Sequence, residues 1–347
     1  MKKIFLFVAC ASIMVMGAKA QSAEELYNAG KAEFAKYDKL FGEYQLAHSQ
    51  NENAPDPTIG ERATALMNGF ELLQQALPLD TIIEKNKDGS PKIDKKTGKP
   101  KFKTKYSKDI VNLLTGHIND VLNVGNAGLM GNDYATSFKA FNFFNQLVNS
   151  SLVKDIPFDQ ATLGEVAFYE GYSAFQIKNY NAAFKAFSSA LAKGYTENQT
   201  EDFKNASVAN IVQGYCDSKQ YNEAITYVDN AITLEPTSAL LYDMKGFIVE
   251  QKDGLNAAEA LYKKATELDP SFPNGFYDLG RVIYDRAEKI IEQNPNKTSK
   301  ELAPTLVPLY NEALPLFKKA KELDADGSKT EASKFIDAIE YQLELLR

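Results

Sequence analysis

The 347-residue sequence contains no tryptophan and only two histidines and two cysteines. The histidines, His48 and His117, fall in separate stretches, and neither an HExxH nor a CxxC motif occurs. A metal site normally needs three or four protein ligands, and a serine or cysteine nucleophile needs a base positioned beside it. We therefore expect no metal, no cofactor and no catalytic residue, that is, a protein that is not an enzyme.

Apolar runs of the roughly 20 residues needed to cross a membrane are also missing. The one long apolar stretch, residues 4–17, is shorter and directly follows Lys2 and Lys3. Small residues then mark a cleavage site between Ala20 and Gln21. This order is typical of a secretory signal peptide, so we expect export to the periplasm of a Gram-negative envelope and no transmembrane segment.

Cys10 raises the alternative of a lipoprotein, which is cut immediately before a lipidated cysteine. Phe7-Val8-Ala9 precedes it, with no leucine three residues ahead, and this spacing disfavours lipidation. After cleavage at Gln21 the chain would keep a single cysteine, Cys216, so no internal disulfide could form.

Outside one lysine-rich segment, acidic residues outnumber basic ones. The net charge is −7, and removal of the three lysines in residues 1–20 takes it to −10. Residues 83–108 carry ten lysines against three acidic residues, so the rest of the mature chain is at about −17. An acidic body repels nucleic acid, and we expect no partner of that class.

The lysine-rich segment has turn signals at residues 88–91 and 97–100, and polar and aromatic residues alternate over 101–106. This pattern predicts a loop or a short exposed hairpin. Its charge favours either a solvated loop or weak contact with an anionic envelope surface. Just before it, Asp80-Thr81-Ile82 resembles an O-glycosylation sequon of exported proteins in some Gram-negative bacteria.

One spacing recurs in the second half of the chain: an alanine, a large residue four positions later, and an alanine three positions after that. The copies are Ala183-Phe187-Ala190, Ala224-Val228-Ala231, Ala258-Tyr262-Ala265 and Ala313-Phe317-Ala320. These positions share one helix face, which is notched and can be approached closely by a partner helix bearing glycine. Gly171, Gly246 and Gly280 lie in separate helical patterns upstream of a copy.

The third copy ends in Asp269-Pro270, and an aromatic-rich pattern begins at Phe276. Proline lacks the backbone N–H and disfavours helical geometry in the residue before it. The stretch therefore predicts a helix, a short turn and a second helix.

These features resemble the tetratricopeptide repeat (TPR) family, whose repeats are helix–turn–helix units of 34 residues. Residues 242–270 match in Tyr242, Gly246, Ala258, Tyr262, Ala265 and Pro270. The resemblance covers residues 165–325, although the family's tryptophan is missing throughout. The alanines that close successive copies are 41, 34 and 55 residues apart, so we expect longer helices or loops outside the one standard interval.

The resemblance implies an all-α fold, a right-handed α-solenoid of TPR-like helical hairpins with a C-terminal capping helix. Residues 330–347 are amphipathic, as such a capping helix requires. The expected organisation is a signal peptide (1–20), a divergent N-terminal TPR-like helical pair (21–82), the lysine-rich insertion (83–108) and the TPR array with its capping helix (109–347).

In this family the first helix of each repeat lines the concave surface and contacts ligand peptides. Among the residues that the resemblance places there, eight are the candidate contacts: Phe168, Tyr172, Phe175, Gln213, Phe247, Tyr277, Arg281 and Tyr284. Aromatic side chains favour binding because they offer a large contact area with few rotatable bonds. The alternative is that some of these aromatics belong to the core between helices.

The function implied by the resemblance is non-catalytic binding or scaffolding in the bacterial envelope, with a peptide or protein partner on the concave face. The lysine and asparagine pattern that clamps a chaperone's C-terminal carboxylate is missing. The alternative is a helical-repeat, glycan-binding envelope protein of the starch-utilisation type. Such proteins usually carry a lipid anchor and tryptophan-rich platforms, neither of which the sequence predicts.

Overall fold

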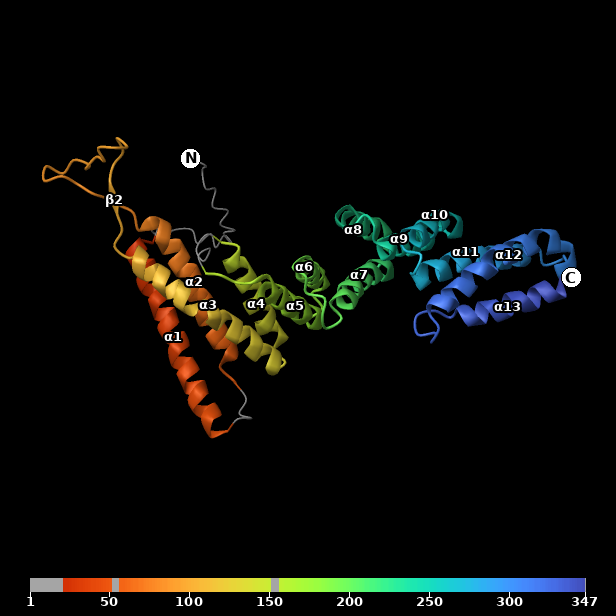
Figure 1. The fold of residues 1–347 in the computed structure, drawn as a ribbon, viewed down its shortest axis with the longest axis horizontal. Coiled ribbons are helices and arrows are strands. Elements are labelled where there is room, and N and C mark those ends of the chain that lie inside the picture. Colours follow the sequence, from red (N-terminus) through yellow and green to blue (C-terminus); the bar gives the residue numbers. More distant parts are fainter. Residues whose placement is uncertain (1–20, 52–55, 151–155, 347) are drawn as a thin grey trace. The chain divides into compact units, whose positions relative to one another are not determined.

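The computed structural model describes residues 21–51, 56–150 and 156–346. The predicted all-α class is confirmed, because the described residues form thirteen helices and only two strands, of two residues each (Figure 1). The predicted signal peptide, including Ala20 and the alternative lipidation site Cys10, lies outside the described residues.

The chain divides into two compact units, each described by itself. The first unit contains α1 (Ala23–Gln50), α2 (Ile59–Leu79), α3 (Ser107–Met130), α4 (Tyr134–Val148) and α5 (Gln160–Gln176). The second contains α6 (Tyr180–Ala192), α7 (Thr200–Asp217), α8 (Tyr221–Leu234), α9 (Ala239–Asp253), α10 (Leu255–Leu268), α11 (Pro273–Gln293), α12 (Ser299–Leu323) and α13 (Ala332–Leu345).

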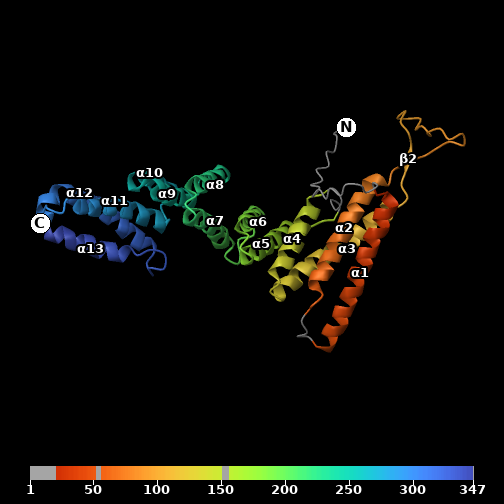
Figure 2. The same cartoon turned by 180° about the vertical axis from the view of Figure 1, so that it is seen from behind.

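In the first unit α1, α2 and α3 lie side by side (Figures 1 and 2). The α1 helix begins with a capping box, in which Ser22 and Glu25 each satisfy the other's backbone N–H. Its inward face carries Phe34, which meets the ring of Phe70 edge-on at a centroid distance of 5.3 Å. A single apolar core thus joins these helices, and it continues into α4.

The lysine-rich segment leaves this unit between α2 and α3. Strands β1 (Ile82–Ile83) and β2 (Phe102–Lys103) pair antiparallel, with Ile82 opposite Lys103 and Ile83 opposite Phe102. All four residues are exposed, and the segment makes its own ladder contacts, such as Lys92 N–H to the Glu84 carbonyl at 2.8 Å. Its contact with anionic envelope surfaces stays a prediction.

Asp80 fixes the point at which this segment returns to the helices. Its carboxylate is 2% exposed and accepts hydrogen bonds from the backbone N–H groups of Lys105, Tyr106 and Ser107, and from the Ser107 hydroxyl. It therefore caps the start of α3 from a position 27 residues away in the chain. Burial alone would raise the pKa of Asp80, but these hydrogen bonds hold it below its ordinary value.

We expect Asp80→Asn to lower the free energy of unfolding by ~1–3 kcal/mol at pH 7, because buried N–H donors lose a charged acceptor. A carboxyl group with a lowered folded-state pKa stabilises above its unfolded pKa, about 3.9, and that contribution is lost as the pH falls further. Urea unfolding should therefore show a larger difference in the free energy of unfolding between variant and wild type at pH 7 than near pH 3. Asp38→Asn, at an exposed position, is the control. An equal difference in the free energy of unfolding between Asp80→Asn and wild type at both pH values would contradict this explanation.

The alanine frame predicted from the sequence is buried in all four of its copies. The second helices α6, α8, α10 and α12 carry its four copies, and all twelve frame residues are buried: Ala183, Phe187, Ala190, Ala224, Val228, Ala231, Ala258, Tyr262, Ala265, Ala313, Phe317 and Ala320. Gly246 of α9 faces the ring of Tyr262, and a Cβ at Gly246 would lie 2.7 Å from that ring. Helix approach in this repeat therefore depends on the glycine, as predicted.

The turn between α10 and α11 has the predicted form. The α10 helix ends at Leu268, the Asp269 carboxylate accepts hydrogen bonds from the Ser271 N–H and hydroxyl, and α11 begins at Pro273. The longest interval between alanines is taken up by helix length, since α11 has 21 residues and α12 has 25.

Candidate functional site

A groove in the second unit lies between the first helices of three successive helical pairs. Its lining residues come from α7, α9 and α11, and its volume is about 390 Å³. The apolar part of the lining is Val212, Leu240, Met244 and Phe247, and the polar part includes Asn205, Gln213, Asp243, Asn274 and Asp278. None of these residues belongs to a second helix, so the groove occupies the side on which the resemblance places ligand contacts.

Asp243 is the most unusual residue of the groove. It is 8% exposed, and within the described part of the chain its Oδ1 atom has no hydrogen-bond partner. The Oδ1 atom of Asn274, across the groove on α11, is also buried without one. Burial raises the pKa of Asp243 well above its ordinary value; the nearby charge of Asp278 raises it further and that of Arg281 opposes the shift.

Arg281 organises the acidic residues beside the groove. Its guanidinium donates two hydrogen bonds to the Glu250 carboxylate, at 2.9 and 2.6 Å, and one each to Asp278 and Asp285 at 3.2 Å. Glu250 also accepts a hydrogen bond from the buried Tyr262 hydroxyl at 2.8 Å. One cation is thus shared among three carboxylates, and Asp243 adds a fourth acidic group nearby.

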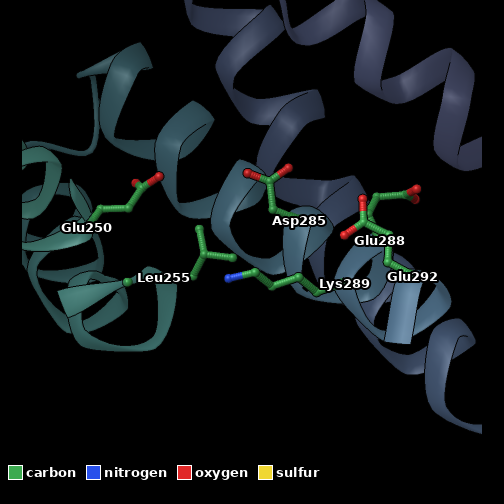
Figure 3. Close-up of a pocket in the computed structure, with 7 residues that line it drawn as sticks. Glu250, Leu255, Asp285, Glu288, Lys289 and Glu292 are labelled. Carbon is green, nitrogen blue, oxygen red and sulfur yellow. The ribbon is translucent and has the colours of Figure 1, made fainter. Parts of the chain in front are cut away.

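The acidic character extends past Arg281 into a second hollow of about 380 Å³ (Figure 3). Glu250, Gly254 and Leu255 line one side, and Asp285, Glu288, Lys289 and Glu292 of α11 line the other. Figure 3 shows Lys289 extending toward Leu255, with acidic side chains on the turns of α11 around it. The hollow therefore carries four carboxylates against one ammonium group.

The eight predicted contact residues have different surroundings. Gln213 and Phe247 line the groove. Arg281 lies beside it, but its guanidinium is engaged by acidic side chains of the same unit.

Phe168, Tyr172 and Phe175 belong to α5 of the first unit. Phe168 is only 4% exposed, stacks on Tyr172 with a centroid distance of 6.2 Å, and lies 5.3 Å from the ring of Tyr195. Phe175 is half-buried. In this unit Phe168 therefore packs as a core residue, the alternative that the sequence left open.

Tyr277 and Tyr284 pack against the closing helix. Both rings meet Phe335 of α13 edge-on, at centroid distances of 5.7 and 5.2 Å. Phe335 in turn stacks on Phe317 of α12 at 4.6 Å. Since no further repeat follows α12 in the described chain, α13 covers this end, as an amphipathic cap should.

We expect Tyr284→Ala to loosen α13, with a loss of ~2–3 kcal/mol in the free energy of unfolding, because the ring packs between Tyr310 and Phe335. Amide hydrogen exchange of α13 should rise. Gln213→Ala, at an exposed groove position, is the matched control and should stay within ~0.5 kcal/mol. Unchanged exchange in α13 would show that the tyrosine ring does not hold the cap.

Asp243, Asn274 and Asp278 were not predicted from the sequence. Their signal was helical periodicity: Asp243, Phe247 and Glu250 follow one face of α9, and Asn274, Asp278 and Arg281 follow one face of α11. Projecting from the predicted contacts along each helix face would have found them.

In residues 21–51, 56–150 and 156–346, no group of three or more potential metal ligands occurs. Instead, His117 Nδ1 pairs with Asp120 at 2.9 Å, and its ring packs 4.2 Å from Phe34. Across the same residues, no helix is both long and apolar enough to span a membrane.

No protein-family model matches the sequence. A TPR repeat-containing protein of Methanocaldococcus jannaschii is 24% identical over 232 residues, which are 64% of this chain and 39% of that protein. The chain thus spans about two fifths of the length of this relative.

Among solved structures, a TPR-repeat protein from Bacteroides fragilis NCTC 9343 is 22% identical, with coverage of 65% of this chain and 98% of that one and a TM-score of 0.36. YrrB, described as a TPR protein with an unusual peptide-binding site, is 15% identical, with coverage of 63% and 92% and a TM-score of 0.31. These TM-scores are low, so the similarity to TPR proteins rests on the chain's own repeat frame and on the archaeal relative.

The alanine frame that suggests TPR helices in the sequence is the same frame that packs those helices in the structure. In this frame, and in its similarity to the archaeal TPR repeat-containing protein, the chain resembles the tetratricopeptide-repeat proteins.

Proposed function

We propose that this protein is a non-catalytic interaction protein that binds a segment of a protein partner in the groove between α7, α9 and α11. The observation that carries the proposal is the composition of that groove. Apolar side chains of α7 and α9 lie beside buried acceptor atoms of Asp243 and Asn274 that have no partner in the described chain. Concave sites with a mostly apolar lining and a few directed polar groups are typical binding sites.

The TPR architecture supports the same proposal. Its first helices present side chains of successive repeats to one face, while its second helices use their small residues to pack. A bound segment could therefore contact α7, α9 and α11 at once, and aromatic residues such as Phe247 would supply contact area at low entropic cost.

We further propose that the protein acts in the periplasm after removal of a signal peptide. This part rests on the pattern of residues 1–20 alone, two lysines, an apolar stretch and small residues before Gln21. Sequencing the N-terminus of the natural protein and fractionating the envelope test it. An N-terminus at a lipidated Cys10 would overturn it.

Site-specific photo-crosslinking tests the binding proposal. A photoreactive amino acid is placed at Gln213 or Phe247 in the groove, or at the exposed Thr226 of α8 as a control, in cells that make the protein. The proposal predicts one shared partner captured from both groove positions and not from Thr226. Equal capture from all three positions, or capture from Thr226 alone, would contradict the assignment to the groove.

A further inference from the structure

The groove is lined by a carboxyl group that lacks a cation of its own. Asp243 is 8% exposed and its Oδ1 atom has no partner in the described residues. A buried carboxylate without a paired charge is costly. The nearest guanidinium, Arg281, already donates to Glu250, Asp278 and Asp285.

The unused polar atoms around this position are acceptors. Asp243 Oδ1 and Asn274 Oδ1 are both buried without a partner in the described residues, and the Asp278 carboxyl lines the same groove. Three residues that carry acceptor groups therefore line one groove, and a bound group with several donors would satisfy them. An ammonium group has three donors and no acceptor, and its charge would also compensate the acidic cluster.

The walls suit the rest of a lysine side chain. The groove is lined beside its acidic residues by apolar side chains, those of Val212, Leu240, Met244 and Phe247. Lysine buries its four-carbon stem along apolar surface and extends a compact charged head, so both parts would find matching surroundings.

The negative charge around the groove also favours a cationic ligand. The adjoining hollow adds Glu288 and Glu292 to Glu250 and Asp285, against Lys289 (Figure 3). This field would attract a basic segment and repel an acidic one. Burial raises the pKa of Asp243, as expected of a carboxyl group that has no adequate counter-charge of its own.

We propose that the groove selects partner segments that insert a lysine side chain between Asp243, Asn274 and Asp278. This inference rests on the proposed function, since it names the chemistry of the segment bound there. It also gives a reason for a carboxyl group placed where it costs stability, because such placements are typical of functional sites.

Short random-sequence peptides serve as the probe. The protein from Gln21 to Arg347 is screened against them, and each bound peptide is remade with its lysines acetylated or replaced by arginine. We expect bound peptides to contain lysine, and acetylation to weaken binding about tenfold or more because it removes the charge. Arginine should bind more weakly than lysine, since its planar fork differs from a compact ammonium.

Asp243→Asn should remove the preference for lysine over acetyl-lysine. Its melting temperature should be unchanged or higher, because the variant no longer buries an unpaired carboxyl group. Asp337→Asn, an exposed acidic residue on α13, changes the net charge equally and should keep the preference.

The outcomes separate the two levels of the proposal. Peptides that bind equally well with and without acetylation would overturn the lysine assignment and leave peptide binding intact. A preference that survives Asp243→Asn, or tighter binding of the arginine forms, would also overturn it. Failure of every peptide to bind would overturn this inference together with the proposed function.

Discussion

Replacement of Tyr262 by alanine is expected to lower the free energy of unfolding of the second unit by ~3–5 kcal/mol. The side chain is fully buried in α10 and fills the space opposite Gly246 on α9. Its hydroxyl also donates to Glu250, which holds Arg281. The substitution would therefore leave a cavity between the two helices and remove a hydrogen bond from the acidic network.

Urea unfolding combined with amide hydrogen exchange in α9 and α10 measures this loss. Tyr262→Phe keeps the ring and loses only the hydrogen bond, so it should cost about 1 kcal/mol. Tyr341→Ala, at a side chain that is 60% exposed, should change the free energy by less than ~0.5 kcal/mol. Equal effects of Tyr262→Ala and Tyr341→Ala would show that the alanine frame is not the packing surface.

A comparable loss, ~3–5 kcal/mol, is expected in the first unit when Arg62 is replaced by methionine. Arg62 is 1% exposed, forms an ion pair with Asp56, and lies 5.3 and 4.7 Å from the ring centroids of Phe41 and Tyr44. Methionine can fill much of the volume but leaves the Asp56 carboxylate, whose side chain is only 12% exposed, without its cation.

The double variant Arg62→Met with Asp56→Asn separates charge from packing. If the loss comes from the uncompensated carboxylate, the double variant should recover most of the stability, because removing both partners of a buried pair is often nearly neutral. Thermal and urea unfolding of the two variants measure the difference. A double variant as unstable as the single one would assign the loss to the aromatic contacts of Arg62.

The helical framework could be predicted because it depends on local and repeated signals. The alanine spacing follows from the period of a helix, and Asp269-Pro270 ends α10 through the backbone chemistry of proline. Helix length was harder to predict. The α12 helix runs through Pro304, Pro308 and Pro315, since its buried face against α11 outweighs the lost backbone hydrogen bonds.

The candidate site was predicted less completely, because it depends on which helices meet. The resemblance selected Gln213 and Phe247 as contact residues, and both line the groove. It could not show that Phe335 of α13 covers Tyr277 and Tyr284, because these contacts join residues 58 and 51 positions apart in the chain. Asp243 was overlooked because its meaning lies in burial without a partner, which no single-sequence pattern reports.

The central claim is that the first helices α7, α9 and α11 form the binding surface. Amide hydrogen exchange of the protein, with and without the partner captured by cross-linking, tests it most directly. The account predicts slower exchange in the groove segments 205–213 and 240–247 and at the start of α11, with α8 and α10 unchanged. Protection confined to α8 and α10, with the groove segments unaffected, would contradict it.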